Sequence, residues 1–292
     1  MLKFLTGWRM PAIVLLIIAS LAGCAQLDTQ QRKWIFQASV LHTDDDGAHL
    51  DGMDDVWIQV PPHDSASLST AAPDRSNPRL HGLWLAGSRK NAPVLLYLHG
   101  ARRNVESSAF RIRRMHELGF AVLAIDYRGF GRSSDELPSE ASVDEDARLA
   151  WAWLAAKHPG RDRYIFGHSL GGAIAVRLAS EVTDAKGLIV EGTFTSIPAV
   201  FETMKWGWLP ITPLITTRFD SADRIAQVKV PVLVVHGEDD GLIPPALGRA
   251  LFDRATSPKR FVLVPGGTHY STNGLGQEQY RDAIRELFGL GA

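Results

Sequence analysis

Cysteine is almost absent from this sequence, and so is any excess of charge of one sign. The single Cys, at position 24, excludes a disulfide within the chain, a cysteine-rich zinc site and an iron–sulfur cluster. The 31 Lys and Arg residues nearly balance the 32 Asp and Glu residues, so that the formal net charge is -1. A nucleic-acid-binding protein would carry a marked basic excess, and this balance argues against one. Internal repeats and low-complexity tracts are missing as well.

The composition is otherwise typical of a globular protein. Hydrophobic residues make up 45% and charged residues 22% of the 292 residues, values close to the average for folded domains. This length is compatible with one large domain or two small ones. The acidic run at residues 44–46 lacks the alternating oxygen ligands and the distal Glu of a calcium loop, so we expect no metal site there.

The first residues have the pattern of a secretory signal peptide. Lys3 and Arg9 precede a run without charge, residues 10–27, most of which is apolar. Within this run, Leu-Ala-Gly-Cys at residues 21–24 resembles the bacterial lipoprotein processing box, in which the Cys becomes the lipidated N-terminus after cleavage. A single-pass signal anchor is the alternative, because the run is at the lower limit of length for spanning a bilayer.

The resemblance to lipoproteins implies a division of the chain and a location. Residues 1–23 would be the signal peptide, residues 24–54 the anchor and linker, and residues 55–292 the folded domain. Several acyl chains on Cys24 would hold the protein at a membrane, since each buried CH₂ contributes about 0.8 kcal/mol. Ala25, where an Asp would stand in the other sorting class, favours the outer membrane of the cell envelope, facing the periplasm.

Strand-like and helix-like segments alternate downstream of residue 55. Apolar runs bounded by turn residues predict strands, and helical patterns of similar length separate several of them. This alternation predicts an α/β fold with a mostly parallel central sheet and helices on both faces. The predicted strands are residues 56–60, 80–85, 93–98, 120–125, 164–166, 188–190, 232–235 and 261–264, and the predicted helices are residues 105–118, 144–158, 170–181, 246–255 and 277–288.

Residues 197–219 interrupt this alternation. They include Phe201, Trp206, Trp208 and Leu214, which are too many apolar side chains for a plain loop. We interpret the segment as a small lid inserted between two strands. Large aromatic side chains need a partner, so they either pack on the edge of the sheet or line an acyl-binding groove. We favour the groove, because an inserted lid has little core of its own.

The clearest chemical motif is Gly-His-Ser-Leu-Gly-Gly at residues 167–172. It matches the pattern G-x-S-x-G between a predicted strand and a predicted helix, which is the context of a nucleophile elbow. Ser169 would occupy a strained turn that requires small residues two positions before and after it. The N-terminus of the following helix would also favour a developing oxyanion. An inert serine in a glycine-rich turn is the alternative.

A serine nucleophile needs a base, and the base needs an acid that orients it. On folds with a nucleophile elbow, the acid and then the His follow the serine in the chain. Only His236 and His269 follow Ser169. His236 ends an apolar strand beside an acidic loop, which favours a structural role. His269 follows two glycines after the last predicted strand, and we take it as the base.

Three carboxylates are candidates for the acid. We favour Asp240, in the loop that follows the strand at residues 232–235. Asp239 is interpreted as a solvated loop charge, and Glu191, at the end of the preceding strand, remains the other alternative.

The oxyanion hole needs two backbone N–H groups. Leu170, the residue after the nucleophile, supplies one of them. Ala101, in the loop after the strand at residues 93–98, is our second donor, because Gly100 permits the turn. Arg102 and Arg103 follow. We interpret them as solvated surface residues, and contact with an anionic group of the substrate is the alternative.

Several motifs in this order resemble the α/β-hydrolase superfamily. They are His99-Gly100, Asp-Tyr-Arg-Gly-Phe-Gly-Arg-Ser at residues 126–133, the elbow, and residues 236–244. Residues 126–133, Glu-Gly-Thr-Phe-Thr-Ser-Ile at residues 191–197 and the short lid are similar to the serine-aminopeptidase-like branch, which also holds monoacylglycerol lipases and protein depalmitoylases. This resemblance covers about residues 55–290. It implies an α/β-hydrolase fold with a small helical lid, and hydrolysis of an ester, thioester or amide without a cofactor.

We therefore expect a serine hydrolase of the carboxylesterase or lipase class. Ser169, Asp240 and His269 would cleave a small acyl ester or thioester through an acyl-enzyme, and Phe201, Trp206 and Trp208 would contact the substrate. The intact triad argues against the first alternative, a non-catalytic binding lipoprotein on the same fold. An amidase or peptidase is the second alternative, although the lid holds no acidic cluster for the free amine of a peptide. The expected partners are the substrate and a membrane, with no nucleic acid and no metal.

Overall fold

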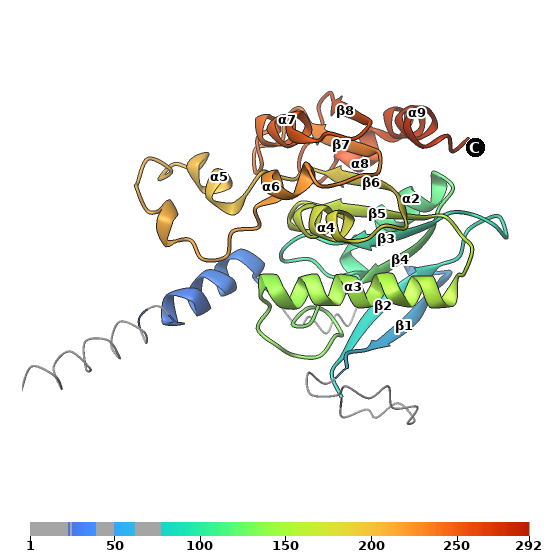
Figure 1. Ribbon diagram of the computed structural model, residues 1–292, viewed down its shortest axis with the longest axis horizontal. Helices are drawn as coiled ribbons and strands as arrows, with labels where there is room; N and C mark the ends of the chain where they lie inside the picture. The colour runs from blue at the N-terminus through green and yellow to red at the C-terminus, as the bar shows by residue number, and fades with distance from the viewer. Residues whose placement is uncertain (1–22, 24, 39–49, 62–76, 292) are drawn as a thin grey trace, which may run out of the picture.

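One sheet between two layers of helices makes up the body of the protein (Figure 1). The computed structural model describes residue 23 and residues 25–38, 50–61 and 77–291. In this part of the chain the strands are β1 (Met53–Gln59), β2 (Arg79–Leu85), β3 (Val94–Leu98), β4 (Ala121–Ile125), β5 (Arg163–His168), β6 (Ala185–Glu191), β7 (Val232–Gly237) and β8 (Lys259–Val264). The α-helices that pack around these strands are α2 (Ala109–Glu117), α3 (Glu140–Lys157), α4 (Leu170–Glu181), α5 (Ile197–Glu202), α6 (Ser221–Ile225), α7 (Pro245–Arg254), α8 (Thr272–Leu275) and α9 (Gln277–Phe288).

The sheet has the strand order β1-β2-β4-β3-β5-β6-β7-β8. The pairs β1–β2 and β2–β4 are antiparallel, and all other neighbouring strands are parallel. Because β3 and β5 to β8 run the same way, their C-terminal ends lie along one edge of the sheet, where α/β proteins bind their ligands. The predicted mostly parallel sheet is confirmed.

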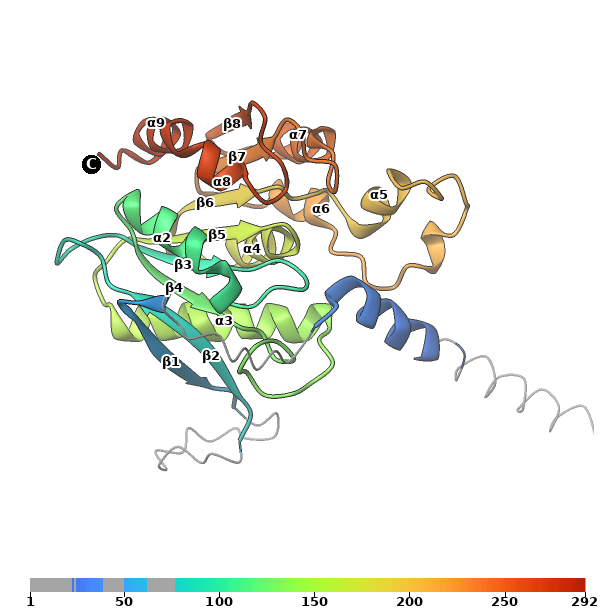
Figure 2. The ribbon, with the colours of Figure 1, turned by 180° about the vertical axis from the view of Figure 1, so that it is seen from behind.

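Each face of the sheet has its own hydrophobic core. Along β3, Leu96 and Leu98 belong to a cluster with α3, α4, α6 and α7, whereas Leu95 and Tyr97 belong to a cluster with α2 and α9. This alternation follows from the two-residue period of a strand. It also explains why the sequence shows continuous apolar runs, since both faces are covered. The predicted helices on both faces are confirmed (Figures 1 and 2).

Helix α3 begins four residues earlier than the pattern predicts. The side chain of Ser139 accepts a hydrogen bond from the N–H of Ser142, and the hydroxyl of Ser142 accepts one from the N–H of Ser139. Such a capping box satisfies two of the free N–H groups at a helix start. The helix therefore starts at Glu140, where the apolar pattern is not yet visible.

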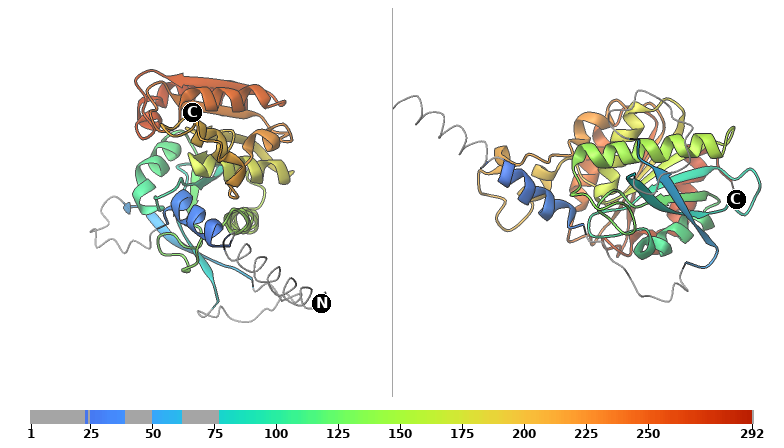
Figure 3. Two further views of the ribbon diagram at one scale, coloured as in Figure 1. Left: turned by 90° about the vertical axis from the view of Figure 1, so that its left-hand side faces the viewer. Right: turned by 90° about the horizontal axis from the view of Figure 1, so that it is seen from below.

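The segment that the sequence assigns to anchor and linker contains a helix, residues 25–36, which we call the N-terminal helix. It lies beside residues 197–219 in both views of Figure 3. Its last residue, Phe36, is fully buried between the rings of Phe130 and Phe219. The linker interpretation therefore misses a packed element. Cys24 and the predicted signal peptide, apart from Gly23, lie outside the described residues.

Candidate active site

Ser169 occupies the turn between β5 and α4. Its backbone has φ 56° and ψ −123°, a conformation that costs free energy for a residue with a side chain. Hydrogen bonds hold the turn: the N–H of Ser169 donates to the carbonyl of Glu191 at 2.9 Å, and its own carbonyl accepts from Gly172 N–H and Thr193 Oγ1. The strained turn lifts the serine side chain out of the helix and the strand, as a nucleophile elbow does.

Two glycines of the motif are required because backbone carbonyl oxygens pack closely against them. A Cβ at Gly167 would lie 2.2 Å from the carbonyl oxygen of Gly171, and a Cβ at Gly171 would lie 2.1 Å from that of Leu98. Real Cβ atoms are not found this close to backbone, so the spacing G-x-S-x-G follows from the packing of α4 onto β3 and β5.

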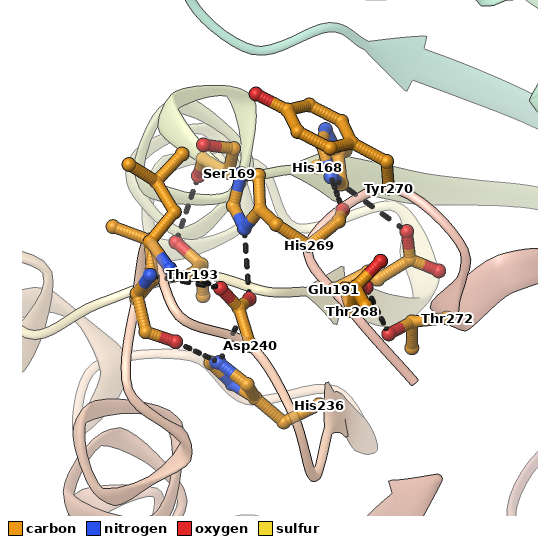
Figure 4. A network of polar contacts seen from close by, with 12 residues as sticks. His168, Ser169, Glu191, Thr193, His236, Asp240, Thr268, His269, Tyr270 and Thr272 are labelled. Carbon is orange, nitrogen blue, oxygen red and sulfur yellow. Dashed lines mark hydrogen bonds and ion pairs between the residues drawn. The ribbon is translucent and has the colours of Figure 1, made fainter. Parts of the chain in front are cut away.

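The structure brings Ser169, His269 and Asp240 together at the C-terminal edge of the sheet. His269 Nδ1 lies 2.8 Å from Asp240 Oδ2. In Figure 4 the ring of His269 lies between Ser169 and Asp240, with its other nitrogen on the side of the serine. His269 and Asp240 are both buried. This is the spatial order that a base between a nucleophile and an orienting acid requires.

Asp240 is held as a carboxylate. Its Oδ1 accepts hydrogen bonds from the N–H groups of Leu242 and Ile243, at 3.0 and 2.8 Å. His236 Nε2 lies 3.4 Å from Oδ2 and also 2.8 Å from the carbonyl oxygen of Ile243. Burial by itself raises the pKa of Asp240, but the hydrogen bonds from His236, His269 and Ile243 outweigh it and lower that pKa far below its usual range. His236 thus contacts the loop that carries Asp240, in keeping with the structural role expected from the sequence.

Neither alternative acid contacts the ring of His269. Asp239 is exposed. Glu191 is fully buried, but its Oε1 accepts from Arg111 Nε at 3.0 Å and its Oε2 accepts from the hydroxyl of Tyr280. Both of its oxygens are therefore engaged away from the base.

The two predicted oxyanion donors lie on different elements near the serine. Leu170 is the first residue of α4, and Ala101 follows β3. In the described part of the chain, neither N–H group takes part in a recorded hydrogen bond. After Ala101 the chain turns through a left-handed residue, Arg102 (φ 64°), whose N–H donates to the carbonyl of Phe36 at 3.0 Å. The N-terminal helix thus holds one side of the oxyanion loop.

A family profile described as serine aminopeptidase, S33, matches residues 89–221 and 211–274, which is more than half of the chain. The chain belongs to this family. The match confirms the branch of the α/β-hydrolase superfamily that the motifs resemble, and with it a hydrolase.

Curated relatives share sequence with this member of the serine aminopeptidase family. An uncharacterized protein of Mycobacterium tuberculosis is 37% identical over 200 residues, which are 68% of this chain and 70% of that protein. A lysophosphatidylserine lipase of Danio rerio is 30% identical over 207 residues, 61% of this chain and 54% of the lipase. The chain therefore spans about half the length of the lipases that it matches.

Solved structures confirm the α/β-hydrolase fold. An esterase of Pyrococcus furiosus superposes with a TM-score of 0.65 at 17% identity, over 86% of this chain and 96% of that one. Est1E of Butyrivibrio proteoclasticus, solved with ferulic acid, has a TM-score of 0.62 at 21% identity, over 74% of this chain and 98% of Est1E.

A buried network supports the loop that carries the base of this family member, and sequence reasoning missed its central residue. Arg111, on α2, is fully buried, and its Nη2 donates to the carbonyls of His269 and Tyr270, each at 3.2 Å. His168 Nε2 lies 3.0 Å from the same carbonyl of His269 and 3.1 Å from Arg111 Nη2. Burial, with the nearby guanidinium, holds the pKa of His168 well below its usual range, so this imidazole is neutral. An Arg within an amphipathic helix pattern gives no signal of such a role.

The segment at residues 126–133, which carries the family resemblance, contacts β2, the loop after β3 and helix α3. Asp126 Oδ1 accepts from the N–H of Val105, and Asp126 Oδ2 lies 3.2 Å from His81 Nδ1. Arg128 pairs with Asp146 of α3 at 2.8 Å. None of these contacts reaches the triad, so the motif is structural.

The role of the three predicted substrate residues stays a prediction. Phe201 is half-buried at the end of α5, whereas Trp206 and Trp208 are 58% and 73% exposed. This exposure argues against close packing of the two tryptophans on the sheet edge, and the acyl-binding groove stays a prediction. In the described ranges, no group of three His, Cys, Asp or Glu side chains is arranged to hold a metal.

Proposed function

We propose that the protein is a serine hydrolase that cleaves carboxylic acyl esters or thioesters through an acyl-enzyme. The observation that carries the proposal is the contact of 2.8 Å between His269 Nδ1 and a buried Asp240, with the ring beside an elbow serine. Asp240 would hold the tautomer of His269 that leaves Nε2 free to accept a proton.

In the first half-reaction, Ser169 Oγ attacks the carbonyl carbon of the substrate while His269 Nε2 takes the hydroxyl proton. The N–H groups of Leu170 and Ala101 donate to the developing oxyanion. Collapse of the tetrahedral intermediate breaks the bond to the alcohol or thiol, which leaves with the proton held by His269. Water, deprotonated by His269, then hydrolyses the acyl-Ser169 ester and releases the carboxylic acid.

Membership of the serine aminopeptidase family supports hydrolysis, and the named lipase relatives and esterase neighbours support an acyl ester rather than a peptide as the substrate. The lid adds to this, because residues 197–219 contain a single carboxylate, Glu202, and no acidic cluster that could hold a free amine. A non-catalytic lipoprotein and an amidase remain the competing functions, and the experiment below separates them.

We also propose that the protein is a lipoprotein of the bacterial cell envelope. The processing box that ends at Cys24 supports lipidation of that residue, and Ala25 supports sorting to the outer membrane, facing the periplasm.

A fluorophosphonate probe on the purified protein tests the proposed chemistry. The wild type is expected to be labelled at Ser169, and the Ser169→Ala variant, which lacks only one hydroxyl, is expected to stay folded and unlabelled. A series of esters, thioesters and amides of increasing acyl length then identifies the bond and the chain length. Labelling of Ser169→Ala at the wild-type rate would overturn the mechanism, and a wild type that is neither labelled nor active would favour the non-catalytic alternative.

A further inference from the structure

The N-terminal helix and residues 203–217, which we call the lid tip, are joined to each other. Gln31 Nε2 donates to the carbonyl of Leu214 at 2.7 Å, and Gln31 Oε1 accepts from the N–H of Thr216 at 2.8 Å. The hydroxyl of Thr216 also donates to Asp28 Oδ1 at 3.0 Å. These bonds join parts of the chain more than 180 residues apart. The two segments therefore form one surface.

Exposed apolar side chains gather on this surface. Twelve large hydrophobic residues are exposed in the described part of the chain, and seven of them lie in these two segments. They are Leu27, Trp34, Met204, Trp206, Trp208, Ile211 and Leu214. Large exposed apolar patches on a folded protein mark a site of interaction, because leaving them in water costs free energy.

The exposed apolar residues of the helix share a ridge with the residue that bonds to the lid tip. Leu27, Gln31 and Trp34 are spaced i, i+4 and i+7, so they lie along one ridge of the helix. Because Gln31 in the middle of this ridge bonds to the backbone of Leu214, the exposed side chains of Leu27 and Trp34 flank that contact. Trp34, at 76%, is the most exposed large hydrophobic residue of the described chain.

The chemistry of the lid tip matches a lipid interface. Its only charged residue is Lys205, whose Nζ lies 5.6 Å from the ring centre of Trp206. Tryptophan is favoured at membrane interfaces, where one side of the ring is apolar and the indole N–H stays hydrated. A Lys beside it buries its methylene stem while its ammonium group reaches the headgroups.

The position of the N-terminal segment indicates that a lipid bilayer, rather than a second copy of the chain, covers this surface. The run without charge at residues 10–27 leads directly into the N-terminal helix, and Cys24 precedes Leu27 by only three residues. Any anchor carried by this run, whether acyl chains or a signal anchor, therefore brings a bilayer to the end of the helix. A second copy of the chain would compete for the surface only after displacing that bilayer.

We propose that the N-terminal helix and the lid tip together seat on the lipid bilayer, so that the enzyme takes its acyl substrate from the membrane rather than from water. The substrate class is then a membrane-resident amphiphile with one or more acyl chains. The identity of the substrate rests on the proposed hydrolase function, whereas the seating of the surface does not.

Depth-dependent quenching tests the seating. Trp208→Cys and Trp34→Cys are made singly in the full-length protein, and the new Cys is labelled with an environment-sensitive fluorophore. Each labelled variant is bound to vesicles of phosphatidylethanolamine and phosphatidylglycerol. A nitroxide lipid in these vesicles quenches a fluorophore that enters the bilayer. Leu263→Cys, on β8 and also exposed but outside both segments, is the matched control. Any labelling of Cys24 is common to all variants and is subtracted. We expect roughly threefold stronger quenching at positions 34 and 208 than at position 263, because interfacial side chains lie about 5–10 Å deep.

Equal quenching at positions 208 and 263, or quenching at position 34 alone, would overturn the proposal. Energy transfer between labelled copies without quenching by the lipid would show that a second copy covers the surface, which also overturns it. The readout needs no catalysis, so the same pattern is expected in a Ser169→Ala background. A failure of the proposed hydrolase activity therefore leaves this result unchanged.

Discussion

Ser169 has a backbone with positive φ, and three hydrogen bonds to neighbouring groups hold its turn in this conformation. The same edge of the sheet holds two buried carboxylates with opposite partners. Asp240 faces His269, and Glu191 faces Arg111. Glu191 ends β6 and Asp240 lies in the loop after β7. At the scale of single residues, the group that each carboxylate contacts therefore distinguishes the two.

Asp240→Asn is expected to lower kcat by about 10⁴-fold, because an amide favours the wrong tautomer of the histidine. Steady-state kinetics on a short ester, together with fluorophosphonate labelling rates, measure the loss. Asp239→Asn is the matched control, since it changes an exposed neighbour, and it should stay within about twofold of the wild type. A comparable loss in both variants would contradict the assignment.

Arg111→Met is expected to destabilise the protein by about 3–5 kcal/mol, because it leaves the buried Glu191 without its charged partner. Urea unfolding measures this effect, and the double variant with Glu191→Gln should recover part of it. Since Arg111 also holds the carbonyl of His269, kcat should fall while KM changes little. If the folded Arg111→Met variant retained kcat, the network would be structural only and Arg111 would not position the base.

At the scale of elements, the predicted strands and the five longer helices all occur. A parallel strand that is covered on both faces appears in the sequence as a continuous apolar run. A helix of about three turns is long enough for its apolar residues to recur with the helical period. A helical lid was predicted at residues 197–219, where α5 lies, but the bounds of the short helices were not. Helices α5, α6 and α8 have six, five and four residues, which is too few for a periodic pattern. The N-terminal helix was missed because polar residues dominate it and one aromatic residue at its end makes the main contact with the core.

Phe36→Ala is expected to lower the free energy of unfolding by about 3–5 kcal/mol, since the ring is fully buried between two other rings. Trp34→Ala is the control on the same helix. Its ring is exposed, so the change should stay within about 0.5 kcal/mol. Unfolding in detergent solution measures both. Similar small losses in the two variants would show that the helix does not dock as described.

Asp144, on α3, makes stability depend on pH. Burial raises its pKa to about 7, and Arg177, 4.0 Å away, offsets only part of this. A folded-state pKa above the unfolded value means that the folded protein retains a proton that the unfolded chain releases. Stability should therefore fall as the pH rises from about 4 to about 7.

Asp144→Asn should flatten this fall and, at pH values above the window, stabilise the protein by roughly 1–4 kcal/mol. Urea unfolding across the pH range gives the two curves. Asp135→Asn, an exposed change, should leave the wild-type curve unaltered. A variant at Asp144 that keeps the full pH dependence would assign the effect to another group.

At the scale of the whole molecule, the catalytic edge of the sheet, the lid and the N-terminal helix belong to one continuous assembly. The helix bonds to the lid through Gln31 and to the oxyanion loop through the carbonyl of Phe36. In the described ranges, no helix combines the length and the apolar character needed to cross a bilayer.

Cys24→Ala is expected to stop lipid attachment and to leave an unprocessed precursor, because the proposed processing needs the thiol. Mass spectrometry of the mature N-terminus, in the variant and the wild type, measures this. A wild-type chain that begins at Met1 and carries a free thiol at Cys24 would favour the signal anchor instead.

The sequence by itself determined the layered α/β fold, the family and the residues of the candidate triad. These follow from local rules: apolar runs set the strands, steric limits at Gly167 and Gly171 set the elbow, and chain order together with the place of each residue after a strand favours His269 and Asp240. Only the tertiary structure decided the role of Glu191, the place of Arg111 and the exposure of Trp206 and Trp208. Each depends on contacts or their absence across long separations, such as the 80 residues between Arg111 and Glu191. A local pattern carries no information about such pairs, because their energy comes from a partner that only folding supplies.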